Sequence, residues 1–377
     1  MTQCVLVPAL LMVFGCAPKS ETIGTRIIPV DTPERPPTAN TVQNDSVSQA
    51  PSYYRQGRWQ SDAILRPPMQ KWKVQTQGPI VHPLILSGTS LYAVAGGVVS
   101  KIKTNGQVVW ANDLAADGPV TPADEGILVP TVTGTMQVVD PATGTIINSY
   151  GGFSSIRSPA LPHAQTLAWV ERDGILITAN TQNGPYILGP VSDAASDGDH
   201  YIFGNIHQEV VCIRDFETAW TAQVPGPITG HPVIGQHVVF VSFAPGDSGP
   251  GGVAALDLAN GSVKWLSHIG PAASAPISLG EFLVMATRTG ELVALDPVHG
   301  RTRWSAPSPT MHTTKPAIVG DSIYIGDGMG RLHRYDMADG GRVWSVDLNA
   351  PITGDLVFTD DLIIVGTSDG FVVALSQ

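Results

Sequence analysis

The sequence contains little cysteine and few basic residues, and both shortages limit what the protein can be. Only 3 of its 377 residues are cysteines, which is too few for the disulfide framework of a small secreted domain. Lys and Arg number 21 against 32 Asp and Glu, the formal net charge is −11, and no Lys/Arg cluster occurs. Proteins that neutralise nucleic-acid phosphates present a basic face. The sequence therefore predicts no nucleic-acid partner.

Sustained helical patterning is also missing. No segment repeats apolar residues at helical spacing over several turns, so helices should be scarce. Glycine and proline are abundant instead, with 40 and 31 residues, which predicts frequent turns. Between the turns lie short runs that alternate or are continuously apolar, as β-strands do. These features predict an all-β protein.

The N-terminus resembles an export and anchoring signal. The apolar run over residues 4–15 is too short to cross a bilayer as a helix but suits the core of a signal peptide. It ends in VFGC, which resembles the bacterial lipobox, with Cys16 as the lipidated residue. We expect a lipoprotein signal peptide over residues 1–15. An ordinary cleaved signal peptide is the alternative.

A polar segment follows the signal. Residues 16–58 are rich in Pro, Thr, Ser, Asn and Gln and cannot bury enough apolar area to offset their ordering entropy. We expect a flexible tether that reaches about 40 Å as a coil, followed by a folded domain over residues 59–377. Ala17 after the cysteine resembles sorting to the outer membrane, with the domain facing the periplasm. The cell surface and the soluble periplasm are the alternatives.

One motif recurs along the folded part. ALDLANGSVKW ends at Trp265, ALDPVHGRTRW at Trp304 and RYDMADGGRVW at Trp344, at spacings of 39 and 40 residues. The Asp and Gly should form a tight turn between two strands, and the Trp should pack where neighbouring units meet. The residues assigned to this structural motif are Trp72, Trp110, Tyr150, Trp220, Asp257, Gly261, Trp265, Asp296, Gly300, Trp304, Asp336, Gly340 and Trp344.

Four short strands in each period of about 40 residues are typical of a β-propeller blade. The repeat predicts eight blades, with seven as the alternative because the stretch between Tyr150 and Trp220 fits the motif poorly. The last unit lacks its fourth strand, and the strand at Trp72 lacks the three before it. The N-terminal strand should therefore complete the C-terminal blade and remove a free sheet edge.

The pattern A-x-D-x-x-x-G-x-x-x-W, over about residues 70–377, resembles the tryptophan-docking motif of quinoprotein (PQQ) propellers. This group includes PQQ-dependent alcohol dehydrogenases and the non-enzymatic BamB lipoproteins of the outer-membrane β-barrel assembly machinery. The dehydrogenases are larger, and many clamp the quinone with adjacent cysteines. This sequence has no such pair and no persuasive ligand set for a catalytic calcium. The resemblance therefore implies no enzyme activity and no cofactor.

The resemblance to the BamB family implies a scaffold that binds envelope proteins, including the BamA-type barrel component, as a monomer within a complex. Family members bind BamA through loops on one face, and one loop carries an aliphatic-Arg pair before Ser and Pro. YGGFSSIRSPALP places Ile156 and Arg157 at those positions, as candidate partner-binding residues. The paired acidic residues of a second family loop have no counterpart here. The alternatives are a scaffold in a surface, motility or secretion complex, and a PQQ-dependent dehydrogenase.

Other patterns suggest chemistry but lack the residues that would complete a site. GDSGP, at residues 246–250, resembles a serine-protease nucleophile loop, but no base and orienting acid accompany it. The ten histidines have no metal-ligand spacing, and the Asp-rich turns lack the EF-hand pattern. Cys212 lies in an apolar run and should be a buried structural thiol. We predict no catalytic residue and no metal site.

Overall fold

The structure is a computed structural model. It describes residues 64, 66–152, 154–156, 158–163, 166–171, 175–179, 183–186, 192, 194–205, 207–245, 250–270, 276–308 and 310–377, together with the strand segments 27–29 and 58–59. Within these ranges no helix is long and apolar enough to cross a membrane. Cys16 and Arg157 lie outside the described residues.

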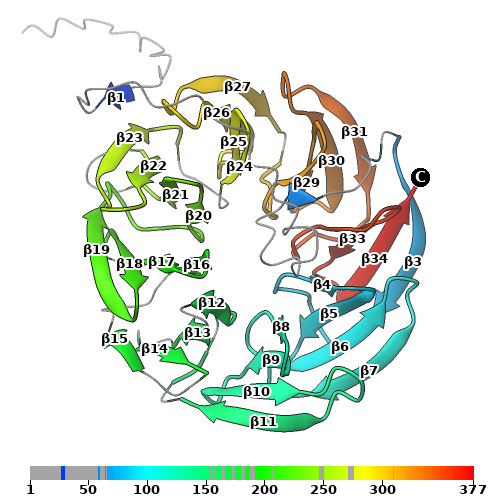
Figure 1. The fold of residues 1–377 in the computed structure, drawn as a ribbon. Coiled ribbons are helices and arrows are strands. Elements are labelled where there is room, and N and C mark those ends of the chain that lie inside the picture. The colour runs from blue at the N-terminus through cyan, green and yellow to red at the C-terminus, as the bar shows by residue number, and fades with distance from the viewer. Residues whose placement is uncertain are drawn as a thin grey trace, which may run out of the picture.

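Every regular element assigned to the described chain is a β-strand, and the strands form eight sheets arranged in a ring (Figure 1). The first four sheets along the chain comprise β4 (Ile85–Ser87), β5 (Ser90–Ala95), β6 (Val98–Lys103) and β7 (Val108–Asp113); β8 (Thr121–Ala123), β9 (Gly126–Pro130), β10 (Thr135–Val139) and β11 (Ile146–Gly151); β12 (Leu161–His163), β13 (Thr166–Val170), β14 (Ile175–Thr178) and β15 (Asn183–Tyr186); and β16 (Ala195–Ser196), β17 (His200–Gly204), β18 (Glu209–Arg214) and β19 (Glu217–Gln223).

The next three comprise β20 (Val233–Ile234), β21 (Val238–Phe243), β22 (Gly252–Asp257) and β23 (Val263–Ser267); β24 (Ile277–Leu279), β25 (Phe282–Ala286), β26 (Glu291–Leu295) and β27 (Thr302–Pro307); and β28 (Ala317–Val319), β29 (Ser322–Gly326), β30 (Arg331–Asp336) and β31 (Arg342–Asp347). The last comprises β32 (Val357–Phe358), β33 (Ile363–Gly366), β34 (Phe371–Ser376) and β3 (Met69–Gln75). The four strands of each set pair antiparallel, and in every set but the last they follow one another along the chain. The prediction of an all-β propeller is therefore confirmed.

The ring is closed by the two ends of the folded domain. β3 pairs antiparallel with β34, Gln75 lying opposite Phe371, as the sequence predicts. The indole N–H of Trp344 donates to the carbonyl of Ile64 at 3.3 Å, so the N-terminal segment also seals the junction with the preceding blade. Closure leaves no sheet of the ring without its outer strand.

Two short strands extend the sheets beyond four strands. β1 (Ile27–Pro29) lies in the segment predicted as a tether and pairs antiparallel with the outer strand β23. β2 (Arg58–Trp59) pairs in parallel with the inner strand β28. The sequence contained no signal for either pairing.

The recurring Trp joins one blade to the next. The Trp265 indole N–H donates to the carbonyl of Pro297 in the following blade at 3.1 Å. Pro297 lies in the turn from Asp296 to Gly300, and a Cβ on Gly300 would come within 2.4 Å of the indole. Gly300 has φ +69°, which glycine adopts without strain. The same indole contact recurs at Trp72, Trp110, Trp220 and Trp304.

Tyr150 does not occupy the docking position, which corrects its assignment. In the blades of Trp110, Trp265, Trp304 and Trp344, a bulge in the third-to-fourth strand pairing immediately precedes the Trp. In β11 the register shift leaves Ile147 unpaired, so Asn148, which follows it, occupies the position that corresponds to the Trp. Tyr150 instead donates its hydroxyl to Glu125 at 2.6 Å and packs on Trp169 of the next sheet. The aromatic character of Tyr150 suggested the assignment, but the spacing from Asp140 and Gly144 points to Asn148.

Candidate partner-binding face

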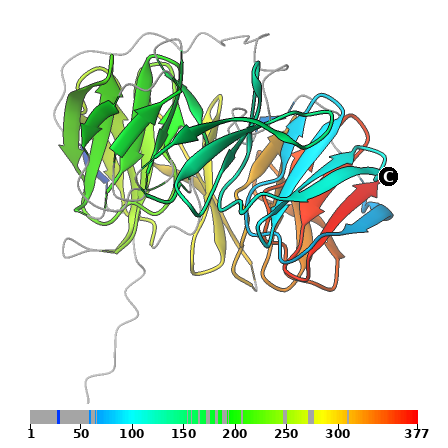
Figure 2. The same ribbon diagram turned by 90° about the horizontal axis from the view of Figure 1, so that it is seen from below.

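One end of the ring carries two kinds of loop. One is the connection that leads from the outer strand of one blade to the inner strand of the next. It lies beside the other, which is the turn between the second and third strands of that next blade. Isolated backbone bridges join the two in six blades: Ile80–Ala95, Ala116–Thr131, Ile156–Glu171, Ile228–Phe243, His312–Asp327 and Ile352–Thr367. We call this end the loop face. The edge-on view shows that the strands of the ring run between this end and the opposite one (Figure 2).

The bridging residue is a recurring structural position. It is isoleucine in four of the six connections, and Ile156 there is fully buried in a cluster with Trp169 and Ile177. The interpretation of Ile156 as a partner-contacting side chain is therefore wrong for this conformation, because the side chain presents no surface. Arg157 follows it outside the described residues.

Five turns of the loop face are capped by their own first residue. A side-chain oxygen of Thr131, Asn205, Thr287, Asp327 or Thr367 accepts a hydrogen bond from the backbone N–H four residues later, at 2.8–3.2 Å. Such local bonds fix the turn conformation without help from neighbouring loops. Each turn is therefore held in place individually.

Neighbouring connections are also tied to one another. The Thr313 hydroxyl donates to the carbonyl of Ile352 at 2.5 Å, and the Thr353 hydroxyl donates to the carbonyl of Ile80. These bonds link the connections of three consecutive blades into one chain of contacts. The described parts of these three connections are thus held in place before any partner arrives, which lowers the entropic cost of binding.

Two methionines stand exposed side by side on this face. Met311, in the connection before β28, is 52% exposed, and Met329, in the β29–β30 turn, is 65% exposed. The Gly328 amide donates to the Met311 carbonyl at 3.2 Å, so the two segments are in direct contact. Exposed methionines are common at binding surfaces because the side chain adapts to different partners. Val81 and Val132 are exposed on the same face in other blades.

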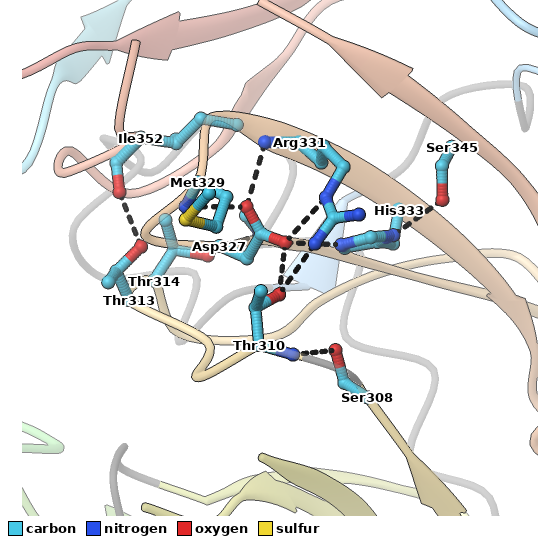
Figure 3. A network of polar contacts seen from close by, with 11 residues as sticks. Ser308, Thr310, Thr313, Thr314, Asp327, Met329, Arg331, His333, Ser345 and Ile352 are labelled. Atoms are coloured by element: carbon cyan, nitrogen blue, oxygen red, sulfur yellow. Dashed lines mark hydrogen bonds and ion pairs between the residues drawn. The ribbon is translucent and has the colours of Figure 1, made fainter. Parts of the chain in front are cut away.

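A buried carboxylate, that of Asp327, lies in the turn that carries Met329 (Figure 3). Oδ1 of Asp327 accepts from the amides of Met329 and Arg331 at 2.9 and 2.8 Å. Its Oδ2 accepts from the Thr310 hydroxyl, from Arg331 Nε at 3.1 Å and from His333 Nε2 at 3.0 Å. Asp327 is fully buried, so these five donors replace its hydration and fix both segments that carry the methionines.

The protonation states of this cluster follow from the contacts. Burial raises the pKa of Asp327, but the bonds from Thr310, the Arg331 amide and His333 outweigh it and lower the pKa to about 2. Burial lowers the pKa of His333 despite its contact with Asp327, so the ring is neutral at pH 7. A carboxylate only accepts, so Nε2 carries the hydrogen and Nδ1 accepts from the Ser345 hydroxyl at 2.6 Å.

The remaining candidates from the sequence are Cys212, the GDSGP segment and the possible metal ligands. Cys212 is buried and free, and burial raises the pKa of its thiol to about 12, so it fits the expected structural thiol. In GDSGP, residues 246–249 lie outside the described chain. The Pro250 carbonyl accepts a hydrogen bond from His268 Nδ1 at 2.9 Å. Among the described residues, no group of three or more His, Cys, Asp or Glu is placed to hold a metal ion.

Sequence reasoning missed the cluster around Asp327. Its signal lies in the alignment of the connections, where Met311-His312-Thr313 replaces the Pro-Ile-Thr found at Pro227-Ile228-Thr229 and at Pro351-Ile352-Thr353. A second signal is the aspartate that begins the β29–β30 turn, where three other turns begin with threonine. Both departures fall in one blade, which is why they meet in space.

Comparison with known proteins places this fold among outer-membrane assembly factors. The family described as "Outer membrane protein assembly factor BamB" matches residues 168–319 and 310–377. Curated relatives with that name include those of Moranella endobia, 26% identical over 278 residues, and Bordetella pertussis, 26% identical over 221 residues. These alignments cover 72% and 56% of this chain, and 65% and 53% of the relatives. The aligned part thus spans less than two thirds of the relatives' length.

Solved structures share the architecture. BamB from Moraxella catarrhalis superposes with a TM-score of 0.69 at 17% identity, covering 82% of this chain and all of that one. The computationally designed Ika8 protein gives a TM-score of 0.70 at 16% identity, covering 80% and 98% of the two chains. At such low identities the likeness establishes the fold alone.

Proposed function

The chain belongs to the BamB family of outer-membrane protein assembly factors, and from this premise we propose that it is a non-enzymatic accessory in the assembly of β-barrel proteins in the outer membrane. Its loop face would bind another envelope protein, with the BamA-type barrel component as the expected partner. The observation that carries this proposal is that Met311 and Met329 are exposed on segments of the loop face that are hydrogen-bonded to each other.

The physical character of the loop face supports a binding role. Interfaces are enriched in methionine and depleted in charge at their centre, and Met311 and Met329 supply such a centre. The hydrogen bonds from Thr313 and Thr353 hold the surrounding connections, so little order has to be gained on binding. A partner can thus be recognised by shape on a rigid surface without any chemistry by the propeller.

Placing a charge on the methionines should disrupt binding. We expect the double variant Met311→Asp, Met329→Asp to recover at least about tenfold less partner, because two carboxylates would lose hydration at the interface centre. The measurement is crosslinking in the native cells followed by purification and quantification of the barrel-assembly components.

The matched control is Val298→Asp, Val343→Asp. These valines are comparably exposed at 54% and 48% but lie in the β26–β27 turn and on the outer strand β31, away from the loop face. Equal losses in both double variants, or no loss in the methionine variant, would refute the binding role of this face. Recovery of a different envelope complex with none of the barrel-assembly components would favour a surface, motility or secretion scaffold instead.

We also propose that Cys16 is lipidated and anchors the domain to the outer membrane. Cys16→Ala should move the protein from the membrane fraction to the soluble fraction, because the lipid would be the only strong membrane contact in this proposal. Cys212→Ala is the control: its thiol is buried in the domain and its loss should leave the fractionation unchanged. Membrane association of Cys16→Ala at the level of the natural protein would exclude the anchor.

Two finer points belong to the proposal. We propose that each of the eight sheets is a blade, including the sheet β12–β15. Gaps in the described chain interrupt this sheet, and the ring has seven blades if it is not counted. Its strands pair in the same meander as the others, and its Ile156–Glu171 bridge repeats the pattern of the loop face. The proposal also requires no turnover with PQQ, calcium and simple alcohols, and measurable turnover would contradict it.

A further inference from the structure

We propose that His312 and His333 form a pH-sensitive latch, which holds the segment of residues 310–315 on the loop face at neutral pH and releases it on acidification. The latch would regulate the loop face whatever partner binds there. It acts in the blade β28–β31, where the connection and the turn that carry the exposed methionines meet.

The first observation is the position of His312. It bridges to Asp327 at the place where four other connections have isoleucine. His312 is 3% exposed, and neither Nδ1 nor Nε2 has a hydrogen-bond partner among the residues that the structure describes. An imidazole buried in this way loses its hydration without compensation, and a charged imidazolium would lose far more. The closed segment therefore accepts only the neutral ring.

The second observation is the set of groups around the ring. The His312 ring lies edge-on to those of His333 and Tyr335, with centroids 5.9 and 6.4 Å away. The titratable and charged groups that face the two histidines are Asp327 and Arg331 from the turn, His333 and Tyr335 from β30, and Arg342 from β31.

Asp327 is the single anion in that set, and five donors already occupy both of its oxygens. His312 makes no hydrogen bond to any described residue, so in the closed arrangement an imidazolium there would have no hydrogen-bond partner among them. A second proton on His333 would sit on Nδ1. Nδ1 could then no longer accept the hydrogen bond from the Ser345 hydroxyl. Acid therefore opposes the closed arrangement at both rings.

The direction of the pH dependence follows from linkage. Burial is the main cause that lowers the pKa of His312, followed by the nearby His333, and the result is about 4. In a released, hydrated segment the pKa returns to about 6.5. The open form thus binds more protons between pH 6.5 and 4, and opening becomes more favourable as the pH falls through that window. Between pH 7.5 and pH 5 the open-to-closed ratio should rise about 30-fold.

Release would change the loop face at two points. The Met311 carbonyl would lose the Gly328 amide, so the two methionines would separate. Thr313 would lose its bond to the Ile352 carbonyl, so the link to the next connection would also break. One buried ring can therefore alter both the apolar centre and the order of the surface around it.

Hydrogen exchange on the full-length protein tests the latch. The amides of Thr313 and Gly328 are bonded to the carbonyls of Gly326 and Met311 in the closed state. After correction for intrinsic exchange rates, their protection should fall about 30-fold between pH 7.5 and pH 5. His312→Ile, which installs the residue of the equivalent connections, should keep the protection and reduce its pH dependence to less than about threefold.

Two further measurements keep the test decisive. His207→Ala removes an exposed histidine from another turn of the loop face and should leave the pH dependence intact. The His312 imidazole resonances should titrate near pH 4 in the natural protein, which does not rely on any variant folding. A flat protection profile in the natural protein, or an unchanged profile in His312→Ile, would overturn the latch. Because the protein is measured alone, failure of the latch is distinct from failure of the proposed partner binding.

Discussion

Replacing Trp265 with alanine should lower the free energy of unfolding by about 3–5 kcal/mol. The side chain is 3% exposed, packs on Phe240 with ring centroids 5.9 Å apart, and belongs to the apolar cluster between two blades. Its removal leaves a cavity and deprives the Pro297 carbonyl of the hydrogen bond from the indole N–H. Urea unfolding of the mature protein measures the loss.

The turn beneath the indole supplies a matched pair of variants. Gly300→Ala places a Cβ 2.4 Å from the Trp265 ring at φ +69°, whereas Gly280→Ala places one in open space at φ +55°. Both variants force an L-residue into a backbone conformation with positive φ, at a cost of about 1–2 kcal/mol. Only Gly300→Ala also displaces the indole. Equal destabilisation by the two variants would show that the docking contact contributes little.

Replacing Asp327 with alanine is expected to cost about 3–5 kcal/mol of unfolding free energy. The change leaves Arg331 and His333 without their anion and removes the acceptor of two backbone amides. Denaturant unfolding at pH 7 is the measurement. Asp369→Ala is the control in the equivalent turn of the last blade, where the carboxylate is substantially exposed and 3.8 Å from Lys73, so less than about 1 kcal/mol should be lost.

Acid titration of stability checks the same residue independently. The pKa of Asp327 lies at about 2, below its ordinary 3.8, because hydrogen bonds to the carboxylate outweigh the effect of burial. Its contribution to stability is therefore complete above pH 3.8 and is lost as the pH falls towards 2. Asp327→Asn should lack this part of the acid-induced loss. A variant with the same acid profile as the natural protein would refute the role assigned to the carboxylate.

The repeat was readable from the sequence because each unit obeys the same local rules. Asp257 and Gly261 form a turn through the aspartate's own bonds and a positive φ, wherever the rest of the chain lies. Closure by β3 was also readable, because an unfinished blade at each end of the repeat leaves two free edges that can pair. Local chemistry and strand counting thus determined the all-β propeller and how it closes.

The candidate site was less readable, and its errors have a common cause. Tyr150 was assigned by residue type, but the register of β11 puts Asn148 at the docking position. Ile156 looked like half of a binding pair, yet the bridge to Glu171 turns it into the core. In both cases a residue's role depends on strand register and on which way its side chain points, and neither is fixed by the identities of its neighbours in the chain.

The sequence by itself determined the fold class, the closing strand and the membership of a propeller family, because these depend on turns and periodicity that act within one repeat. Only the tertiary structure decided which residues form the loop face and which lie beneath it. Asp327, His333 and His312 are brought together because a connection, a turn and a strand of one blade meet at its end. Burial then determines their protonation, and burial is a property of the assembled ring that no single repeat possesses.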